Sequence, residues 1–118
     1  MNEQRFADLL EIMHRAALNA TIFVDGMSFE EFLKDVRTQQ AVVMSLIIIG
    51  ESSAKAIAKH DKLVEQFPQI SWRSMRGMRN RIAHNYTDTN FEIVWQVVQE
   101  ELPRLIVSLN ETLKMSRL

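Results

Sequence analysis

The fold class of this chain depends on residues 41–50, AVVMSLIIIG, which form its longest apolar run. The β-branched residues in this run suit a buried strand followed by a glycine turn as well as they suit a helix. Two observations favour a helix: the sequence has no second strand candidate to pair with it, and residues 54–59 continue with strong helix formers. A helix that is apolar nearly all round is one enclosed by others. The stretch therefore predicts the central helix of an all-α bundle, running from about residue 36 to residue 60.

Helical patterns continue on both sides of this central segment. Apolar residues recur at helical spacing between residues 5 and 20, which indicates an amphipathic first helix. Residues 28–31, SFEE, have the form of a capping box and open a short helix that ends at about residue 35. Residues 89–92, TNFE, have the same form, with Thr89 as the expected N-cap of the last helix. The apolar period of that helix continues through Pro103, so we expect the proline to kink the helix without ending it.

Length and composition narrow the class of protein. A chain of 118 residues is expected to be one domain, residues 1–118, and is long enough to bury roughly two thirds of the surface that its unfolded form exposes. The sequence contains no cysteine, which excludes a disulfide framework, a thiolate metal site and a cysteine nucleophile. Residues 1–5 are polar and the longest apolar run is shorter than a membrane span. We therefore expect a cytoplasmic protein with no membrane contact.

No metal site is expected. Glu11 and His14 have the spacing of one ligand pair of a di-iron helical bundle, but that chemistry needs a second such pair and two further carboxylates. The sequence contains no second Glu-x-x-His. His14 is therefore interpreted as a surface residue.

The charge balance limits how the chain can contact nucleic acid. A net charge of -1 and a pI near 6.3 argue against nonspecific coating, because the affinity of such binding comes mainly from neutralised phosphates. Any RNA contact must therefore be local, and positive charge is concentrated in residues 72–86, WRSMRGMRNRIAHNY. The arginines of this segment are Arg73, Arg76, Arg79 and Arg81. They are candidate RNA ligands, and the alternative interpretation is a solvated helix face.

The arginine-rich segment is expected to form one helix and the turn after it, with Ser71 as the N-cap. The apolar positions at helical spacing, which are expected to be core contacts, are Trp72, Met75 and Met78. Two helical glycines need a reason, because glycine in a helix interior costs about 1 kcal/mol relative to alanine. We expect Gly50 to mark the close approach of another helix. We expect Gly77 to mark close packing as well, within the chain or across a subunit interface.

The motif Arg79-Asn80-x-x-x-His84-x-Tyr86 resembles the signature of the HEPN superfamily, and specifically of the HepT-like (DUF86) toxin ribonucleases. Further matching residues, spread over most of the chain, are Gly50, Glu51, Pro68, Trp72, Trp95, Leu102 and Pro103. The resemblance implies a HEPN-like bundle of four main helices plus a short one. It also implies an endoribonuclease without a cofactor that cuts RNA as a homodimer and is the toxin of a toxin-antitoxin pair.

The residue types in this motif suit cleavage of RNA without a metal ion. The reaction needs a base for the 2′-hydroxyl proton, an acid for the leaving 5′-oxygen and a cation for the charge that grows on the phosphoryl group. His84 suits either proton transfer, because imidazole titrates near neutral pH. Arg79 can grip phosphate oxygens through two parallel donors. Asn80 can donate to a phosphate or hold His84 in one tautomer.

One protomer supplies a single motif histidine, whereas the reaction uses both a base and an acid. On an ideal helix Asn80 and His84 share a face, and Arg79 diverges from His84 by roughly 140°. An isologous contact between two motif helices would bring two copies of Arg79, Asn80 and His84 to one cleft. HEPN ribonucleases build composite sites in this way. The stoichiometry and the resemblance therefore both predict a homodimer.

Two further residues have two interpretations each. Glu51 follows the apolar run, where it either pairs with an arginine of the motif helix and orients it or is a solvated helix residue. Tyr86 by itself is most simply a packing residue. The resemblance implies instead that a nucleotidyltransferase antitoxin of the MntA type transfers AMP onto Tyr86. The added phosphate charge and bulk would repel RNA and block the cleft.

Three classes of function are consistent with the sequence. The first is the RNA-cleaving toxin, with Arg79, Asn80 and His84 as catalytic residues. The second is a non-catalytic HEPN module that binds a nucleotide or a partner, and such a module would tolerate His84→Ala. The third is a plain helical dimerisation protein with surface arginines, which predicts no RNA affinity and no loss of affinity with salt.

Overall fold

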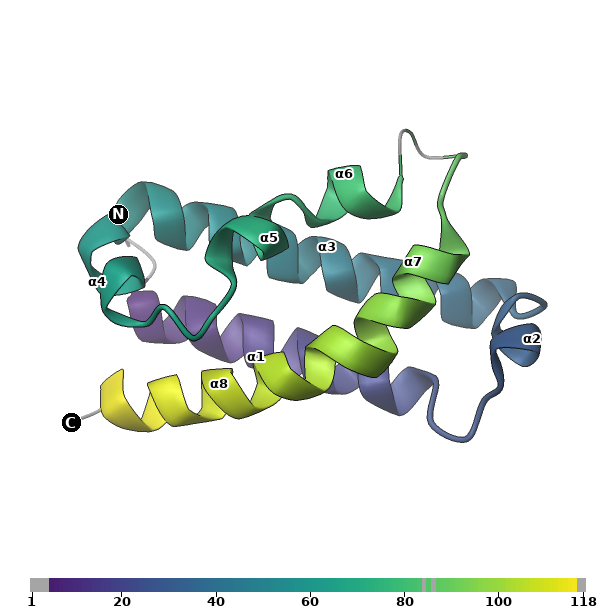
Figure 1. The fold of residues 1–118 in the computed structure, drawn as a ribbon, viewed down its shortest axis with the longest axis horizontal. Helices are drawn as coiled ribbons and strands as arrows, with labels where there is room; N and C mark the ends of the chain where they lie inside the picture. Colours follow the sequence, from purple (N-terminus) through teal and green to yellow (C-terminus); the bar gives the residue numbers. More distant parts are fainter. Residues whose placement is uncertain (1–4, 84, 86, 117–118) are drawn as a thin grey trace.

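The computed structural model describes residues 5–83, 85 and 87–116, which form a bundle of helices (Figure 1). The long helices are α1 (Phe6–Phe23), α3 (Val36–Lys59) and a last helix made of α7 (Phe91–Gln96), the π-helical turn η1 (Val97–Glu101) and α8 (Leu102–Ser116). The short helices are α2 (Phe29–Phe32), α4 (Asp61–Gln66), α5 (Trp72–Arg76) and α6 (Met78–Ile82). The described residues contain no β-strand. The all-α class is therefore confirmed, and the strand alternative for residues 41–50 is wrong.

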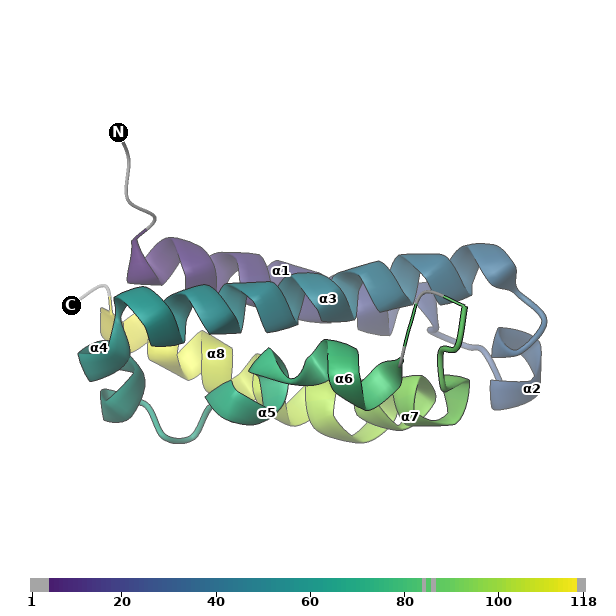
Figure 2. The ribbon, with the colours of Figure 1, turned by 90° about the horizontal axis from the view of Figure 1, so that it is seen from above.

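Helices α1 and α3 run side by side along the molecule, and α5, α6 and the last helix lie on one side of that pair (Figure 2). The fully buried side chains between them include Leu10, Met13, Leu46, Ile49, Leu102 and Leu109. By length and composition α3 could also cross a membrane, with a mean hydropathy of 1.6 over its most apolar window. In the bundle it contacts α1, α5 and α6, which is the central position predicted from its apolar run.

Side-chain caps fix where the helices begin. Asp35 accepts hydrogen bonds from the backbone N–H of Thr38 (3.1 Å) and from the Thr38 hydroxyl (2.8 Å), and these bonds hold the pKa of Asp35 below its ordinary value. The capping box of Ser28 and Glu31 is confirmed, with both reciprocal hydrogen bonds present. Helix α2 ends at Phe32, so it is shorter than the sequence predicts.

The last helix begins one residue later than predicted. Its N-cap is Asn90 and not Thr89, because the Asn90 side-chain oxygen accepts from the backbone N–H groups of Glu92 (3.1 Å) and Ile93 (3.2 Å). Thr89 instead forms an isolated antiparallel bridge with Ala83. The bridge pairs the Thr89 backbone with another segment, which leaves Thr89 outside the helix.

The helix continues past Pro103, so the prediction that the proline does not end it is confirmed. Proline has no N–H for the carbonyl four residues earlier, and its ring crowds that carbonyl. The helix widens in the turn before it: the N–H of Leu102 donates to the carbonyl of Val97, five residues earlier. This π-helical turn ends at Glu101, so the turn decides the direction in which Glu101 projects.

The arginine-rich segment forms two short helices, which corrects the prediction of one. The break lies at Gly77, whose φ of -82° and ψ of 8° depart from the α-helical values. Glycine has a low helix propensity, so an interruption costs least at such a residue. Ser71 precedes α5 as expected, but its side chain makes no cap hydrogen bond. Its carbonyl accepts the N–H of Met75.

The two helical glycines differ. A Cβ atom at Gly50 would lie 2.9 Å from the Met75 carbonyl oxygen and 3.3 Å from the Met78 Cβ. Glycine is therefore what lets α3 approach α5 and α6 so closely, as predicted. A Cβ atom at Gly77 would meet nothing closer than the Arg73 carbonyl oxygen, at 3.6 Å. The expectation of close packing at Gly77 is wrong within the described chain, where this glycine marks the break between α5 and α6.

Candidate active site

Helix α6 carries the first two residues of the motif. Met78 and Ile82 lie one turn apart and are buried, with exposed fractions of 0% and 1%. Arg79 and Asn80 are exposed. The backbone N–H of Asn90 donates to the carbonyl of Ile82 (2.6 Å), which ties the end of α6 to the start of the last helix. Burial of Met78 and Ile82 therefore turns Arg79 and Asn80 toward solvent.

Helix α5 is held by Trp72. The indole is buried and its N–H donates to the Phe67 carbonyl (3.0 Å), while the hydroxyl of Ser53 on α3 donates to the Trp72 carbonyl (2.6 Å). The predicted core role of Trp72, Met75 and Met78 is confirmed. The two arginines of α5, Arg73 and Arg76, are exposed. Arg79 is exposed on the next helix, α6, so exposed positive charge is present on both short helices.

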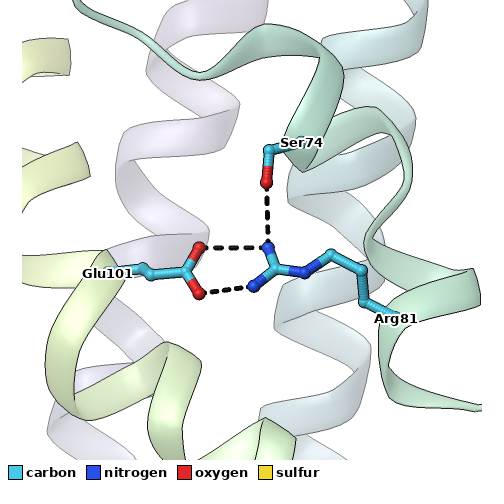
Figure 3. Close-up of polar contacts among 3 residues, drawn as sticks. All are labelled: Ser74, Arg81 and Glu101. Atoms are coloured by element: carbon cyan, nitrogen blue, oxygen red, sulfur yellow. Dashed lines mark hydrogen bonds and ion pairs between the residues drawn. The ribbon is translucent and has the colours of Figure 1, made fainter.

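Arg81 lies between Ser74 on α5 and Glu101 on η1 (Figure 3). Its Nη1 donates to Glu101 Oε1 (3.0 Å) and to the Ser74 hydroxyl oxygen (3.1 Å), and its Nη2 pairs with Glu101 Oε2. The side chains of Arg81 and Glu101 are 31% and 33% exposed. Arg81 thus joins α6 to η1 and α5 through a bidentate ion pair, a geometry that fixes orientation as well as distance. We call Ser74, Arg81 and Glu101 the clamp.

His84 and Tyr86 lie outside the described residues, so their predicted roles stay predictions. The residues near them in the chain are ordered by local contacts. Ala83 bridges Thr89, and the Asn85 side-chain oxygen accepts from the N–H (2.9 Å) and the hydroxyl (2.8 Å) of Thr87.

Glu51 is exposed on α3. Among the residues that the structure describes, it forms no ion pair with an arginine. Of its two interpretations, the solvated helix residue fits this position, and the carboxylate that holds an arginine of the motif segment is Glu101.

Sequence reasoning missed Glu101 and Ser74. The available signal was the acidic pair Glu100-Glu101 directly before Leu102-Pro103. Helical spacing did not show which of the two glutamates faces α6, because the π-helical turn changes the register at this place. Ser74 lies seven residues before Arg81, a spacing that would place both residues on one face of a continuous helix. The helix is broken at Gly77, so this spacing did not predict their contact.

The arginines of the segment differ in exposure. Arg73, Arg76 and Arg79 are exposed cations on α5 and α6, and guanidinium groups suit phosphate recognition. The charge of Arg81 is balanced by Glu101. The segment can therefore bind phosphate at residues that lie close in sequence to the motif histidine.

Comparison with known proteins identifies the relatives of this chain. The family model described as Ribonuclease HepT-like matches residues 13–112. A Thermococcus cleftensis protein named "Probable ribonuclease HepT" is 38% identical over 98 residues, which cover 83% of this chain and 86% of the relative.

Two proteins named as "Putative RNase" are also similar. The one from Methanocaldococcus jannaschii is 36% identical over 92 residues, covering 78% of this chain and 74% of the relative. The one from Caldanaerobacter subterraneus is 35% identical over 94 residues, covering 80% and 81%. No solved structure matches significantly. The match of the family model over residues 13–112 shows that this chain belongs to the HepT-like ribonuclease family.

Proposed function

We propose that this protein is a cytoplasmic, metal-independent endoribonuclease whose active site is built from Arg79, Asn80 and His84. The observation that carries the proposal is the placement of Arg79 and Asn80 on the exposed side of α6, in a chain of the HepT-like family. The short helix fixes both residues through the burial of Met78 and Ile82. His84 follows Ala83, the residue directly after α6, and so lies four residues after Asn80 in the sequence.

The chemistry is a transesterification within the RNA strand. A base takes the 2′-hydroxyl proton, the 2′-oxygen bonds to phosphorus, and the bond from phosphorus to the 5′-oxygen breaks as an acid protonates that oxygen. The products carry a 2′,3′-cyclic phosphate and a 5′-hydroxyl. Arg79 stabilises the charge on the phosphoryl oxygens, and Asn80 orients the phosphate or His84. Arg73 and Arg76 bind flanking phosphates from α5.

Two proton transfers call for two histidines, so the active form is a homodimer with one His84 from each subunit. A surface for the second copy is offered by α3. Val36 and Met44 are 62% and 56% exposed there, and they line a groove of about 400 Å³ between α3 and the start of α7, whose other side chains are both apolar and polar. The groove is also lined by Thr89, the bridge partner of Ala83. A two-fold contact here adjoins the segment that carries His84.

Regulation acts on Tyr86. A partner nucleotidyltransferase antitoxin of the MntA type transfers AMP from ATP to the Tyr86 hydroxyl and releases pyrophosphate. The new phosphodiester carries a negative charge beside the cleft, which repels RNA phosphate. Intact mass after incubation with ATP and such a partner should show an adenylyl adduct on the wild type and none on Tyr86→Phe. Unmodified wild-type protein would rule out this form of regulation.

The decisive experiment is cleavage of end-labelled RNA in excess EDTA by the wild type, His84→Ala and His14→Ala. His14→Ala is the matched control, because it removes a histidine from α1, outside the motif. We expect cyclic-phosphate products from the wild type and the control, and none from His84→Ala. Retained cleavage in His84→Ala would disprove the catalytic role of this histidine.

An inactive wild type would also be informative once mass spectrometry has shown Tyr86 to be unmodified. RNA or nucleotide binding without cleavage would then support a non-catalytic binding module. The absence of salt-dependent RNA binding would leave the plain dimerisation protein.

A further inference from the structure

The clamp of Ser74, Arg81 and Glu101 has a role that differs from the RNA-binding role predicted for Arg81. We propose that the clamp is a positioning device for the ribonuclease reaction: it sets the orientation of α6, and through α6 that of Arg79 and Asn80. Arg81 and Glu101 are therefore positioning residues that do not contact RNA. This inference rests on the proposed function, since Arg79 and Asn80 are the groups that it positions.

Helix α6 needs such a support because it is short. Its length of 5 residues is far below the roughly 12–15 residues at which an isolated helix becomes even marginally stable in water. Its direction must therefore be set by tertiary contacts. Met78 and Ile82 provide contacts on the buried side only. These two side chains lie one above the other, and the backbone bond from Asn90 to the Ile82 carbonyl holds only the end of the helix. A third side-chain contact, away from the line of Met78 and Ile82, is therefore needed to stop the helix from rocking about that line.

Arg81 supplies that third contact. It follows Asn80 directly and projects about 100° away from it around the helix axis. Its guanidinium bonds both carboxylate oxygens of Glu101 and the hydroxyl of Ser74, so it is held from η1 and from α5 at once. A movement of Arg81 would carry Arg79 and Asn80 with it, because all three share one helical turn.

The other end of the clamp is rigid. Glu101 ends the π-helical turn η1, in which Val97 and Val98 are 0% and 2% exposed, and the next residue, Leu102, is 0% exposed. These buried residues fix the backbone from which Glu101 projects. The edge of the Arg81 guanidinium that bonds Glu101 and Ser74 is also the kind of paired donor that would grip a phosphate. Because this edge of the guanidinium is already bonded within the protein, we do not expect it to bind RNA.

The test compares Glu101→Gln with Glu100→Gln. Both remove one negative charge at adjacent positions, but Glu100 is exposed and is not part of the clamp. In steady-state cleavage we expect Glu101→Gln to lower kcat by roughly tenfold to a hundredfold, since a small misplacement of a catalytic group has effects of this size. RNA affinity should stay within about twofold, and Glu100→Gln should match the wild type in both.

Direct binding of RNA by Arg81 would change kcat and RNA affinity in a different way. If Arg81 binds RNA directly, Glu101→Gln frees its guanidinium, so RNA affinity stays the same or increases and kcat does not fall. Arg81→Gln would then weaken binding and lower the salt dependence of the affinity by about one phosphate contact. This pattern would overturn the proposal.

The double variant Arg81→Gln, Glu101→Gln separates the two roles further. In a positioning pair each single change already breaks the ion pair, so the double variant should lose about as much kcat as either single variant. Losses that multiply would mean that the two residues act independently and would also overturn the proposal.

Hydrogen exchange tests the clamp without using the enzymatic activity. We expect the backbone N–H groups of Arg81 and Ala83, whose acceptors lie within this segment, to exchange faster in Glu101→Gln and to be unchanged in Glu100→Gln. Equal exchange in all three proteins would reject the positioning role. A wild type that fails to cleave RNA would reject the proposed function, while the exchange rates would still decide whether the clamp holds α6.

Discussion

Helix α6 is held on two sides by contacts of opposite kinds. On the side of α3 the contact is apolar and tight: Met78 is fully buried, and Gly50 lets the helices meet closely. On the side of η1 the contact is the ion pair of Arg81 and Glu101, about one third exposed. Burial of apolar surface contributes stability in proportion to area, whereas partly exposed ion pairs contribute little. The contact with α3 therefore stabilises the fold, while the contact with η1 sets the orientation of α6.

The largest effect is expected on the apolar side. Met78→Ala removes a fully buried side chain from the contact between α6 and α3, which should lower the free energy of unfolding by about 2–5 kcal/mol. Urea denaturation followed by circular dichroism measures this change. Met115→Ala is the matched control, because Met115 is 58% exposed on α8 and its truncation should change stability by less than about 0.5 kcal/mol. Equal losses of stability in the two variants would contradict the claim that the contact between α6 and α3 stabilises the fold.

Gly50→Ala tests the closeness of the same contact. The added methyl group would lie 2.9 Å from the Met75 carbonyl oxygen, so α3 must move away from α5. We expect a loss of about 1–3 kcal/mol in the free energy of unfolding, as for overpacking in a core. Thermal and urea unfolding would measure it. An alanine that leaves stability unchanged would show that the two helices have room to separate.

Gly77→Ala makes the same substitution where there is space. The new Cβ atom would meet nothing closer than 3.6 Å, and a φ of -82° is accessible to alanine. Stability should rise by about 0.4–1 kcal/mol, because alanine restricts the unfolded chain more than glycine does. The same unfolding measurement, beside Gly50→Ala, gives changes of opposite sign. A loss at Gly77 would mean that the break between α5 and α6 depends on this glycine.

The smallest change in stability is expected on the polar side. Glu101→Gln should alter the free energy of unfolding by about 0.2–1 kcal/mol, since the pair is partly solvated. The difference from the wild type should shrink further at high salt. A loss of several kcal/mol at any salt concentration would place the clamp among the contacts that stabilise the fold, and it would erase the distinction between the two sides of α6.

Much of the fold could be predicted from hydrophobic periodicity. The apolar patterns of residues 5–20 and 41–50 predicted α1 and α3, and the continued pattern around Pro103 predicted a helix that passes this residue. Periodicity did not reveal the break at Gly77, because Met75 and Met78 keep a helical spacing across it. It also misplaced the N-cap at Thr89, since the bridge to Ala83 joins residues that no local pattern connects.

The candidate site was predictable only where a motif carries the information. Arg79 and Asn80 were identified by their resemblance to a family signature, and the family itself is confirmed. The partner of Arg81 was not predictable, because the contact between Arg81 and Glu101 spans 20 residues and depends on a π-helical turn. The number of arginines in the sequence does not distinguish Arg73 from Arg81. Only the tertiary arrangement separates an exposed cation from one that is already paired.

The π-helical turn also has a consequence for how this sequence can change over evolutionary time. A turn of this kind is equivalent to a single-residue insertion into a regular helix. Deleting Gln99 would restore an α-helical turn, and every side chain before the deletion would rotate by about 100° relative to those after it. In a homologue that is one residue shorter here, α7 and the glutamate before α8 could not both keep their present directions, so the contacts that hold α6 would have to differ. Gap positions in an alignment would then report how the motif helix is supported, even where the motif itself is unchanged.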